Sequence, residues 1–171
     1  MALEFQRRLL TVSEPNISGR ITPTFARVTT GQWDLSSDYL DFLPLKDGAF
    51  LVCIGDVAGA GLRATFVAAI LKTVLVPQFM QEHPGQVVPS QLLGWLNTKL
   101  HSILEPFSDL FVSFLVGLVD GADCTVTCAS AGNPLPLVHA NHVLRPVEAY
   151  GVVLGVNEHA VYEDVRVQLS P

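Results

Sequence analysis

The chain has few cysteines, few cations and no run of basic residues. Its 171 residues include three cysteines, and 10 Lys or Arg stand against 16 Asp or Glu, for a net charge of −6. Nucleic acids and anionic membranes need clustered positive charge, so the sequence predicts neither as a partner. Cys53, Cys124 and Cys128 lie in strand-like segments, and we expect buried free thiols rather than disulfides.

Long hydrophobic runs are also absent. No apolar run approaches the ~20 residues that a membrane-spanning helix needs. The first ten residues, MALEFQRRLL, lack the apolar core and cleavage site of a secretion signal. We therefore expect a cytoplasmic protein without a membrane span. The hydrophobic share of 49% is ample for one core, which predicts a single domain over residues 1–171.

The order of expected elements favours an α+β fold. A short helix is expected within residues 1–12 and a sandwich over residues 18–171. One helix is expected to begin at Leu62 and to end or kink at Pro77. Ser90 is the expected N-cap of a second helix. Two adjacent helices between strands differ from the strand–helix alternation of α/β folds. The expected strands are residues 21–29, 39–45, 49–55, 111–119, 124–131, 135–139, 142–147 and 161–169.

Apolar residues at helical spacing predict the buried face of each helix. For the first helix these residues are Leu62, Phe66, Val67, Ile70, Leu71, Val74 and Leu75. For the second they are Leu92, Leu93, Leu96, Leu100, Ile103 and Leu104.

Residues 51–73 combine a strand, an aspartate, a glycine-rich turn and a helix. Residues 59–64, GAGLRA, fit the G-x-G-x-x-A dinucleotide fingerprint. That fingerprint requires a parallel strand after the helix, whereas a second helix follows here. Asp56 is open to two interpretations, a turn aspartate that accepts local N–H groups or a metal ligand.

A hairpin turn at residues 46–48 brings two aspartates together. Asp38 and Asp56 lie eight or nine residues from the turn on either side, so both fall at the same end of the sheet. Two carboxylates there suit a hard cation such as Mg²⁺ or Mn²⁺. Arg63, after the glycine turn, either reaches a phosphate or lies exposed on its helix. His139 and His142 flank a turn, but a zinc site lacks a third ligand.

Four segments, in this order, resemble those of PPM-type metal-dependent serine/threonine phosphatases. The likeness is to the branch of bacterial sporulation stage II protein E and sigma-factor-regulator phosphatases, and it covers nearly the whole chain. The segments are DYLDF at residues 38–42, GDVAGAG at 55–61, ASAGNP at 129–134 and GVVLGV at 151–156.

The resemblance implies a β-sandwich flanked by helices, in α-β-β-α layers with mostly antiparallel strands. It implies hydrolysis of phosphoserine or phosphothreonine on a regulatory protein, such as an anti-sigma-factor antagonist, by water activated between two Mn²⁺ or Mg²⁺ ions. Asp56 would bridge the ions, and Asp38 and the backbone carbonyl of Val57 would add ligands. Gly55, Gly59 and Gly61 would shape the turn beside them.

The chain departs from the family pattern at several positions. Ser36 and Ser37 stand where the family has two glycines, and Ala60 and Asn133 where it has histidines. The family continues past residues 169–171 into further metal-binding aspartates, so we expect at most one metal site and little hydrolysis by this polypeptide. The alternative is a catalytically inactive pseudo-phosphatase that binds proteins as the output module of a response regulator. We also expect an open sheet edge that a partner or a second copy would cover.

Overall fold

A computed structural model describes most of the chain. The helix expected within residues 1–12 lies outside the described part, as do Ser36 and Ala60. Residues 21–26 have no regular structure, and the rest of the strand expected there is not described. The described residues are 21–26, 37–59, 61–85, 87–107, 109–140 and 142–169.

One antiparallel sheet organises the fold, with strand order β1-β2-β3-β4-β7. A 3-10 turn, η1 (Lys46–Gly48), joins the first two strands where a turn was predicted. The α+β class with antiparallel strands is confirmed, although the last strand is shorter than expected. The strands are β1 (Asp38–Pro44), β2 (Phe50–Val57), β3 (Val112–Asp120), β4 (Thr125–Ala131) and β7 (Val165–Gln168).

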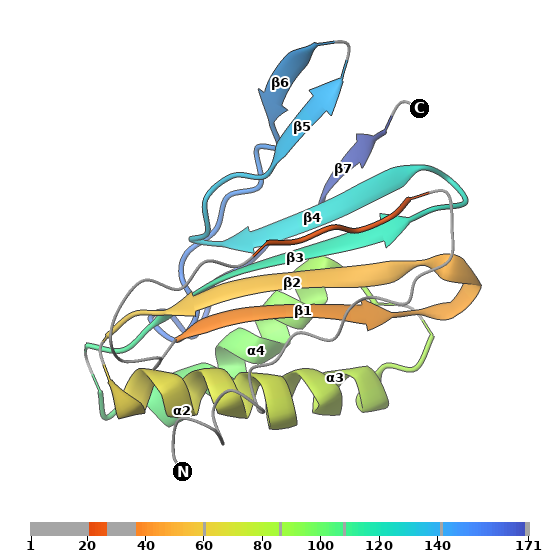
Figure 1. Ribbon diagram of the computed structural model, residues 1–171. Coiled ribbons are helices and arrows are strands. Elements are labelled where there is room, and N and C mark those ends of the chain that lie inside the picture. The colour runs from red at the N-terminus through yellow and green to blue at the C-terminus, as the bar shows by residue number, and fades with distance from the viewer. Residues whose placement is uncertain are drawn as a thin grey trace.

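The predicted hairpin after β4 is also present. Strands β5 (Leu137–Ala140) and β6 (Val143–Pro146) form a separate two-stranded sheet. It extends away from the helices, beyond β4 (Figure 1). Val138 packs with Val147 and Cys128 in a small second core over the β4 side of the main sheet.

All helices described cover one face of the sheet (Figure 1). A continuous helix, Leu62–Glu82, consists of α2 (Leu62–Ile70), a π-helical turn η2 (Leu71–Leu75) and α3 (Val76–Glu82). It is followed by α4 (Pro89–Leu104). These helices pack against buried residues of β2 and β3, including Leu51, Cys53, Phe114 and Val116, to form the main core.

Of the two predicted effects of Pro77, an end or a kink of the first helix, the end is wrong, because the helix continues to Glu82. Proline has no N–H to donate, so a regular α-helix would lose a bond at this point. Here the wide turn comes first: the N–H of Val76 donates to the carbonyl of Leu71, five residues back. Pro77 then occupies the first turn of α3, where a missing donor costs little.

The predicted buried face of this helix is correct only in part. Leu62, Phe66 and Val74 are 55%, 62% and 50% exposed. Small residues, Ala64 and Ala68, face the core instead and allow the helix to lie close to the sheet. The apolar spacing identified a helix but not which side of it is covered.

The second helix begins two residues earlier than predicted and is capped differently. Pro89 is its first residue, and Ser90 is inside the helix rather than at the N-cap. The N–H and Oγ of Ser90 donate to the two carboxylate oxygens of Asp164 at 2.9 and 2.8 Å. Asp164, distant in sequence, thus accepts hydrogen bonds from the first turn of α4. The predicted face of this helix is buried except for Ile103.

The helix Leu62–Glu82 is long and apolar enough, by length and composition alone, to cross a membrane. Polar residues such as Lys72 and Thr73 interrupt this stretch, so the sequence contains no unbroken apolar run here. In the described structure 44% of its most apolar window is buried. The buried side packs on the sheet, as expected for a core helix.

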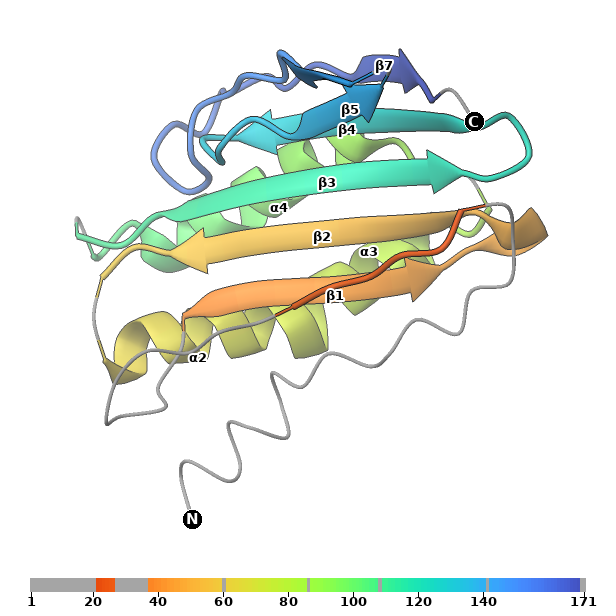
Figure 2. The same cartoon turned by 45° about the horizontal axis from the view of Figure 1, so that its top comes forward.

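The opposite face of the sheet is less covered. Residues 21–26 run across it over β1 and β2 (Figure 2), and the ring of Phe25 lies 5.7 Å from that of Phe42. An open groove of about 760 Å³ lies between this segment and the sheet. Asp38 and Asp56 line the groove, so the candidate site opens onto the face without helices.

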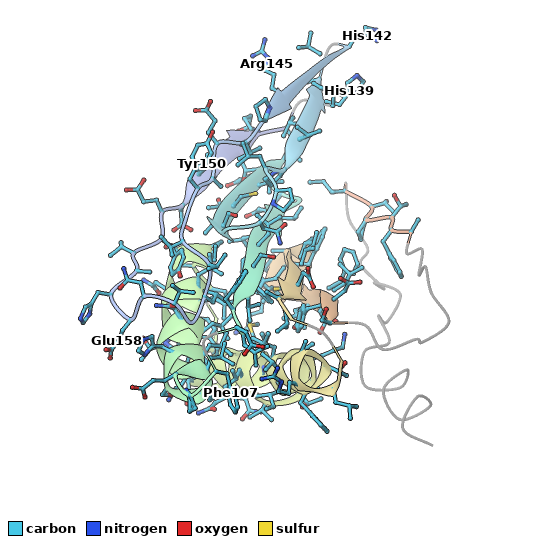
Figure 3. The ribbon with its side chains drawn as sticks, turned by 90° about the vertical axis from the view of Figure 1, so that its left-hand side faces the viewer. Phe107, His139, His142, Arg145, Tyr150 and Glu158 are labelled. Carbon is cyan, nitrogen blue, oxygen red and sulfur yellow. The ribbon has the colours of Figure 1, made fainter. Side chains whose placement is uncertain are left out.

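The fourth family-like motif, residues 151–156, belongs to a loop held by a buried asparagine. Asn97 of α4 donates to the carbonyls of Asn157 and Glu158 at 2.8 and 3.3 Å, and accepts from the N–H of Gly155 at 2.9 Å. Glu158 lies on the α4 side of the molecule (Figure 3). One side chain therefore satisfies three backbone groups of a loop with little regular structure.

Asn97→Ala is expected to destabilise the protein by ~1–3 kcal/mol, since the three backbone groups lose their partner. Chemical denaturation measures this, and Thr98→Ala, which removes an exposed hydroxyl on the next residue, is the matched control. Equal stability of the two variants would contradict this role for Asn97.

Gly55→Ala tests the close approach of β2 to β3. A Cβ on Gly55 would collide with the ring of Phe114, its cross-strand partner. We expect a loss of ~1–3 kcal/mol in the free energy of unfolding. Gly94→Ala is the control, because a Cβ there meets nothing within 4 Å and lies in a helix. That substitution should stabilise by ~0.5–1 kcal/mol, and destabilisation by both would refute the assignment.

Candidate functional site

Asp38 and Asp56 are direct cross-strand partners in the β1–β2 pair. Residues opposite each other in an antiparallel pair share a face of the sheet, with Cβ atoms ~4.5–5.5 Å apart. Both aspartates are exposed and line the groove. The prediction that the hairpin brings them together is confirmed.

Ser37 orients the carboxylate of Asp56. Its Oγ donates to Asp56 Oδ1 at 3.0 Å, and its carbonyl accepts from the N–H of Val57 at 3.3 Å. The N–H and carbonyl of one strand residue point to the same side, so the carbonyl of Val57 also faces the β1 side. Its part in metal binding stays a prediction.

Ser113 and Asn133 add polar groups that the sequence reading did not assign to the site. Ser113 lies opposite Asp56 on β3, and its Oγ donates to the Asp56 carbonyl at 3.5 Å. Asn133 Nδ2 donates to Ser113 Oγ at 3.4 Å. Asn133 comes two residues after the end of β4 and lines the groove. The motif at residues 129–134, noted only for its likeness, was the available signal.

The three glycines of the predicted turn have different roles. Gly59 and Gly61 have φ of 108° and 75°, in the region that favours glycine. The N–H of Ala58 donates to the carbonyl of Phe111 at 2.8 Å and fixes the start of the turn. Gly55 lies inside β2 rather than in the turn. A glycine is needed there because any Cβ would collide with the ring of Phe114. Helix α2 begins directly after Gly61 and is thereby joined to the Asp56 strand.

Arg63 pairs with a carboxylate. Its guanidinium donates to both oxygens of Asp109, at 3.3 and 2.8 Å, and the two side chains are 57% and 55% exposed. Of the two roles considered, the structure shows an exposed helix residue. A phosphate would have to compete with Asp109 for it.

The histidine pair lies away from the candidate site. His139 and His142 are at the far end of the β5–β6 hairpin (Figure 3), with ring centroids 6.4 Å apart. Nowhere in the described ranges do three His, Cys, Asp or Glu side chains group as metal ligands. A zinc site at the hairpin thus has no support.

Two carboxylates fit one hard cation in part. Asp38 and Asp56 offer the oxygen ligands that Mg²⁺ and Mn²⁺ prefer, and water would complete the shell. Within the part of the chain described, no third carboxylate joins them. The donor set fits one ion and not a two-ion centre.

The strand order argues against dinucleotide binding at residues 59–64. The fingerprint belongs to a unit in which a parallel strand follows the helix. Among the described elements, α4 follows the first helix, and every strand pair is antiparallel.

Residues 46–171, about three quarters of the chain, match the model of the stage II sporulation protein E (SpoIIE) family. No curated protein matches the chain. Among solved structures, the RsbU and RsbW domains of Rv1364c from Mycobacterium tuberculosis are similar, with a TM-score of 0.66 and 24% identity. The alignment covers 84% of this chain and 39% of that one.

Two further structures show the same fold. The SiaA-PP2C domain of Pseudomonas aeruginosa has a TM-score of 0.65 and 16% identity, over 81% of this chain and 53% of that one. The PP2C phosphatase domain of SpoIIE from Bacillus subtilis was solved with a fragment of its regulatory domain. It has a TM-score of 0.61 and 19% identity, over 80% of this chain and 39% of that one.

This chain spans less than two thirds of each of these three chains. Identities this low establish the fold, and the fold is that of PPM-type serine/threonine phosphatases. The match to the family model over residues 46–171 establishes the family. The chain belongs to the stage II sporulation protein E family.

Proposed function

We propose that the chain is a phosphoprotein phosphatase domain of bacterial signalling whose Asp38 and Asp56 hold one divalent cation. The cross-strand register supports this most directly. Residues directly opposite each other lie close enough for their carboxylates to bind the same cation, and carboxylate oxygens are ligands that Mg²⁺ and Mn²⁺ prefer. Family membership and the phosphatase fold agree with the proposal.

The residues around the carboxylates suit this role. Ser37 holds Asp56 in one orientation, and Ser113 and Asn133 extend the polar network along the groove. A bound Mn²⁺ or Mg²⁺ would supply charge neutralisation for a phosphoryl group and acidify a bound water. The proposed substrate is phosphoserine or phosphothreonine on a regulatory protein, such as an anti-sigma-factor antagonist, acted on in the cytoplasm.

A second candidate is a protein-binding module without turnover, for example the output domain of a response regulator. The donor set favours it, since the described residues offer only two grouped carboxylates. A single Mg²⁺ held by two carboxylates binds weakly, because this ion gives up its water reluctantly. A regulatory protein or a second copy would then bind without being dephosphorylated.

Asp56→Asn is expected to weaken Mn²⁺ binding more than about tenfold, because the amide removes one of two charged ligands. Electron paramagnetic resonance of free Mn²⁺ gives the affinity. Asp123→Asn is the control: Asp123 pairs with Arg166 and is similarly exposed. If Asp56→Asn and wild type bind Mn²⁺ equally, the metal site is not at Asp56.

Turnover separates the two candidates. A phosphoserine peptide at millimolar Mn²⁺ should lose phosphate with wild type and not with Asp56→Asn if the domain is an enzyme. Binding of Mn²⁺ by wild type without phosphate release would favour the binding module. Release that persists in Asp56→Asn would contradict the proposed site.

A further inference from the structure

A partly buried ion pair lies beneath the candidate site, on the helix side of β1. Lys72 Nζ is 3.4 Å from Asp41 Oδ1, and the two side chains are only 12% and 16% exposed. The same ammonium donates to the carbonyl of Leu40 at 3.1 Å and lies 5.6 Å from the ring centroid of Tyr39. Lys72 therefore contacts three successive residues of the strand that begins at Asp38.

The groups around this pair are neutral. Burial, and then the charge of Asp41, raise the pKa of the Cys53 thiol, although Lys72 opposes them. Burial is also the main cause of the raised pKa of Tyr39, whose hydroxyl donates to Asp41 Oδ2 at 3.5 Å. Both side chains stay uncharged at neutral pH. Lys72 and Asp41 thus balance each other's charge.

An ion pair largely removed from water is weak evidence for stability, because the cost of desolvation offsets much of the attraction. Its position suggests another role. Lys72 lies in the π-helical turn η2, a feature frequent at functional sites. The helix that carries it starts immediately after the glycine turn that follows Asp56. One helix is thus joined to both strands of the candidate site, to one by the chain and to the other by the ion pair.

Strand β1 needs such a connection. It lies at one edge of the described sheet and pairs with β2 alone. Asp38 is its first residue, where a strand end frays most easily. Asp41 is three residues further on, so its side chain points to the opposite face from Asp38. The pair can hold the strand without touching a cation bound at Asp38.

We propose that Lys72 and Asp41 are positioning residues, which fix β1 and its Asp38 carboxylate against the helix and so opposite Asp56. The inference rests on the proposed function, because it gives the pair a role only if Asp38 and Asp56 bind a cation. Neither residue is a ligand. The pair acts on metal affinity through the placement of the strand.

The test compares Mn²⁺ affinity with stability in Lys72→Met and in the double variant Asp41→Asn/Lys72→Met. Lys72→Met leaves the partly buried carboxylate of Asp41 without its ion-pair partner. It should lower both the unfolding temperature and the Mn²⁺ affinity, the latter by about tenfold. The double variant removes both charges, so it should regain most of the stability but not the affinity. Lys99→Met, which removes a lysine over the ring of Trp95, is the control and should bind as wild type does.

Affinities are measured by electron paramagnetic resonance at a temperature where each variant is folded. The inference is overturned if the double variant binds Mn²⁺ as tightly as wild type, because the pair then contributes stability only. If Lys72→Met does not fold, the Mn²⁺ affinity of the double variant alone tests the inference. If wild type itself binds no better than Asp56→Asn, the proposed function fails and the inference falls with it.

Discussion

The register between β1 and β2 is the constraint on which the rest of the site depends. A slip of one residue would turn every side chain of β1 to the other face. Asp38 would then point at the helices, and Asp41 would face the groove. The 3-10 turn at η1 sets this register, with positive φ at Asp47 and Gly48. Tyr39, fully buried against Phe114, holds it from the core.

The two faces of the sheet have different compositions. The helix side of the described sheet is an apolar core with the ion pair of Lys72 and Asp41 at its β1 edge. The other side carries the exposed carboxylates and the serine and asparagine that adjoin them. Strand alternation places these two sets a few residues apart in sequence and on opposite sides in space. Groups on the helix side can therefore influence the site without entering it.

The sequence predicted the sheet well, because strand alternation and turn residues are local signals. Counting from the turn was enough to bring Asp38 opposite Asp56. Long-range contacts were out of reach: Asp164 accepts from Ser90 across 74 positions, and Asn133 meets Ser113 only once β3 and β4 pair. Pro77 was predicted to end or kink the helix for a different reason, namely its missing N–H. The wide turn before it leaves Pro77 in the first turn of α3, where that N–H is not needed. Helical spacing also could not show that Leu62 and Phe66 would lie uncovered.

The wide turn at Leu71–Leu75 amounts to one residue added to a regular helix. Because each residue of an α-helix turns the chain by ~100°, the segments on either side differ in phase by about that angle. Loss of one residue in this turn would keep the helix but rotate α2 against α3. Such a deletion would move Lys72 away from β1 while leaving the composition of the helix almost unchanged. The number of residues in this turn therefore determines which side chains of the helix face β1.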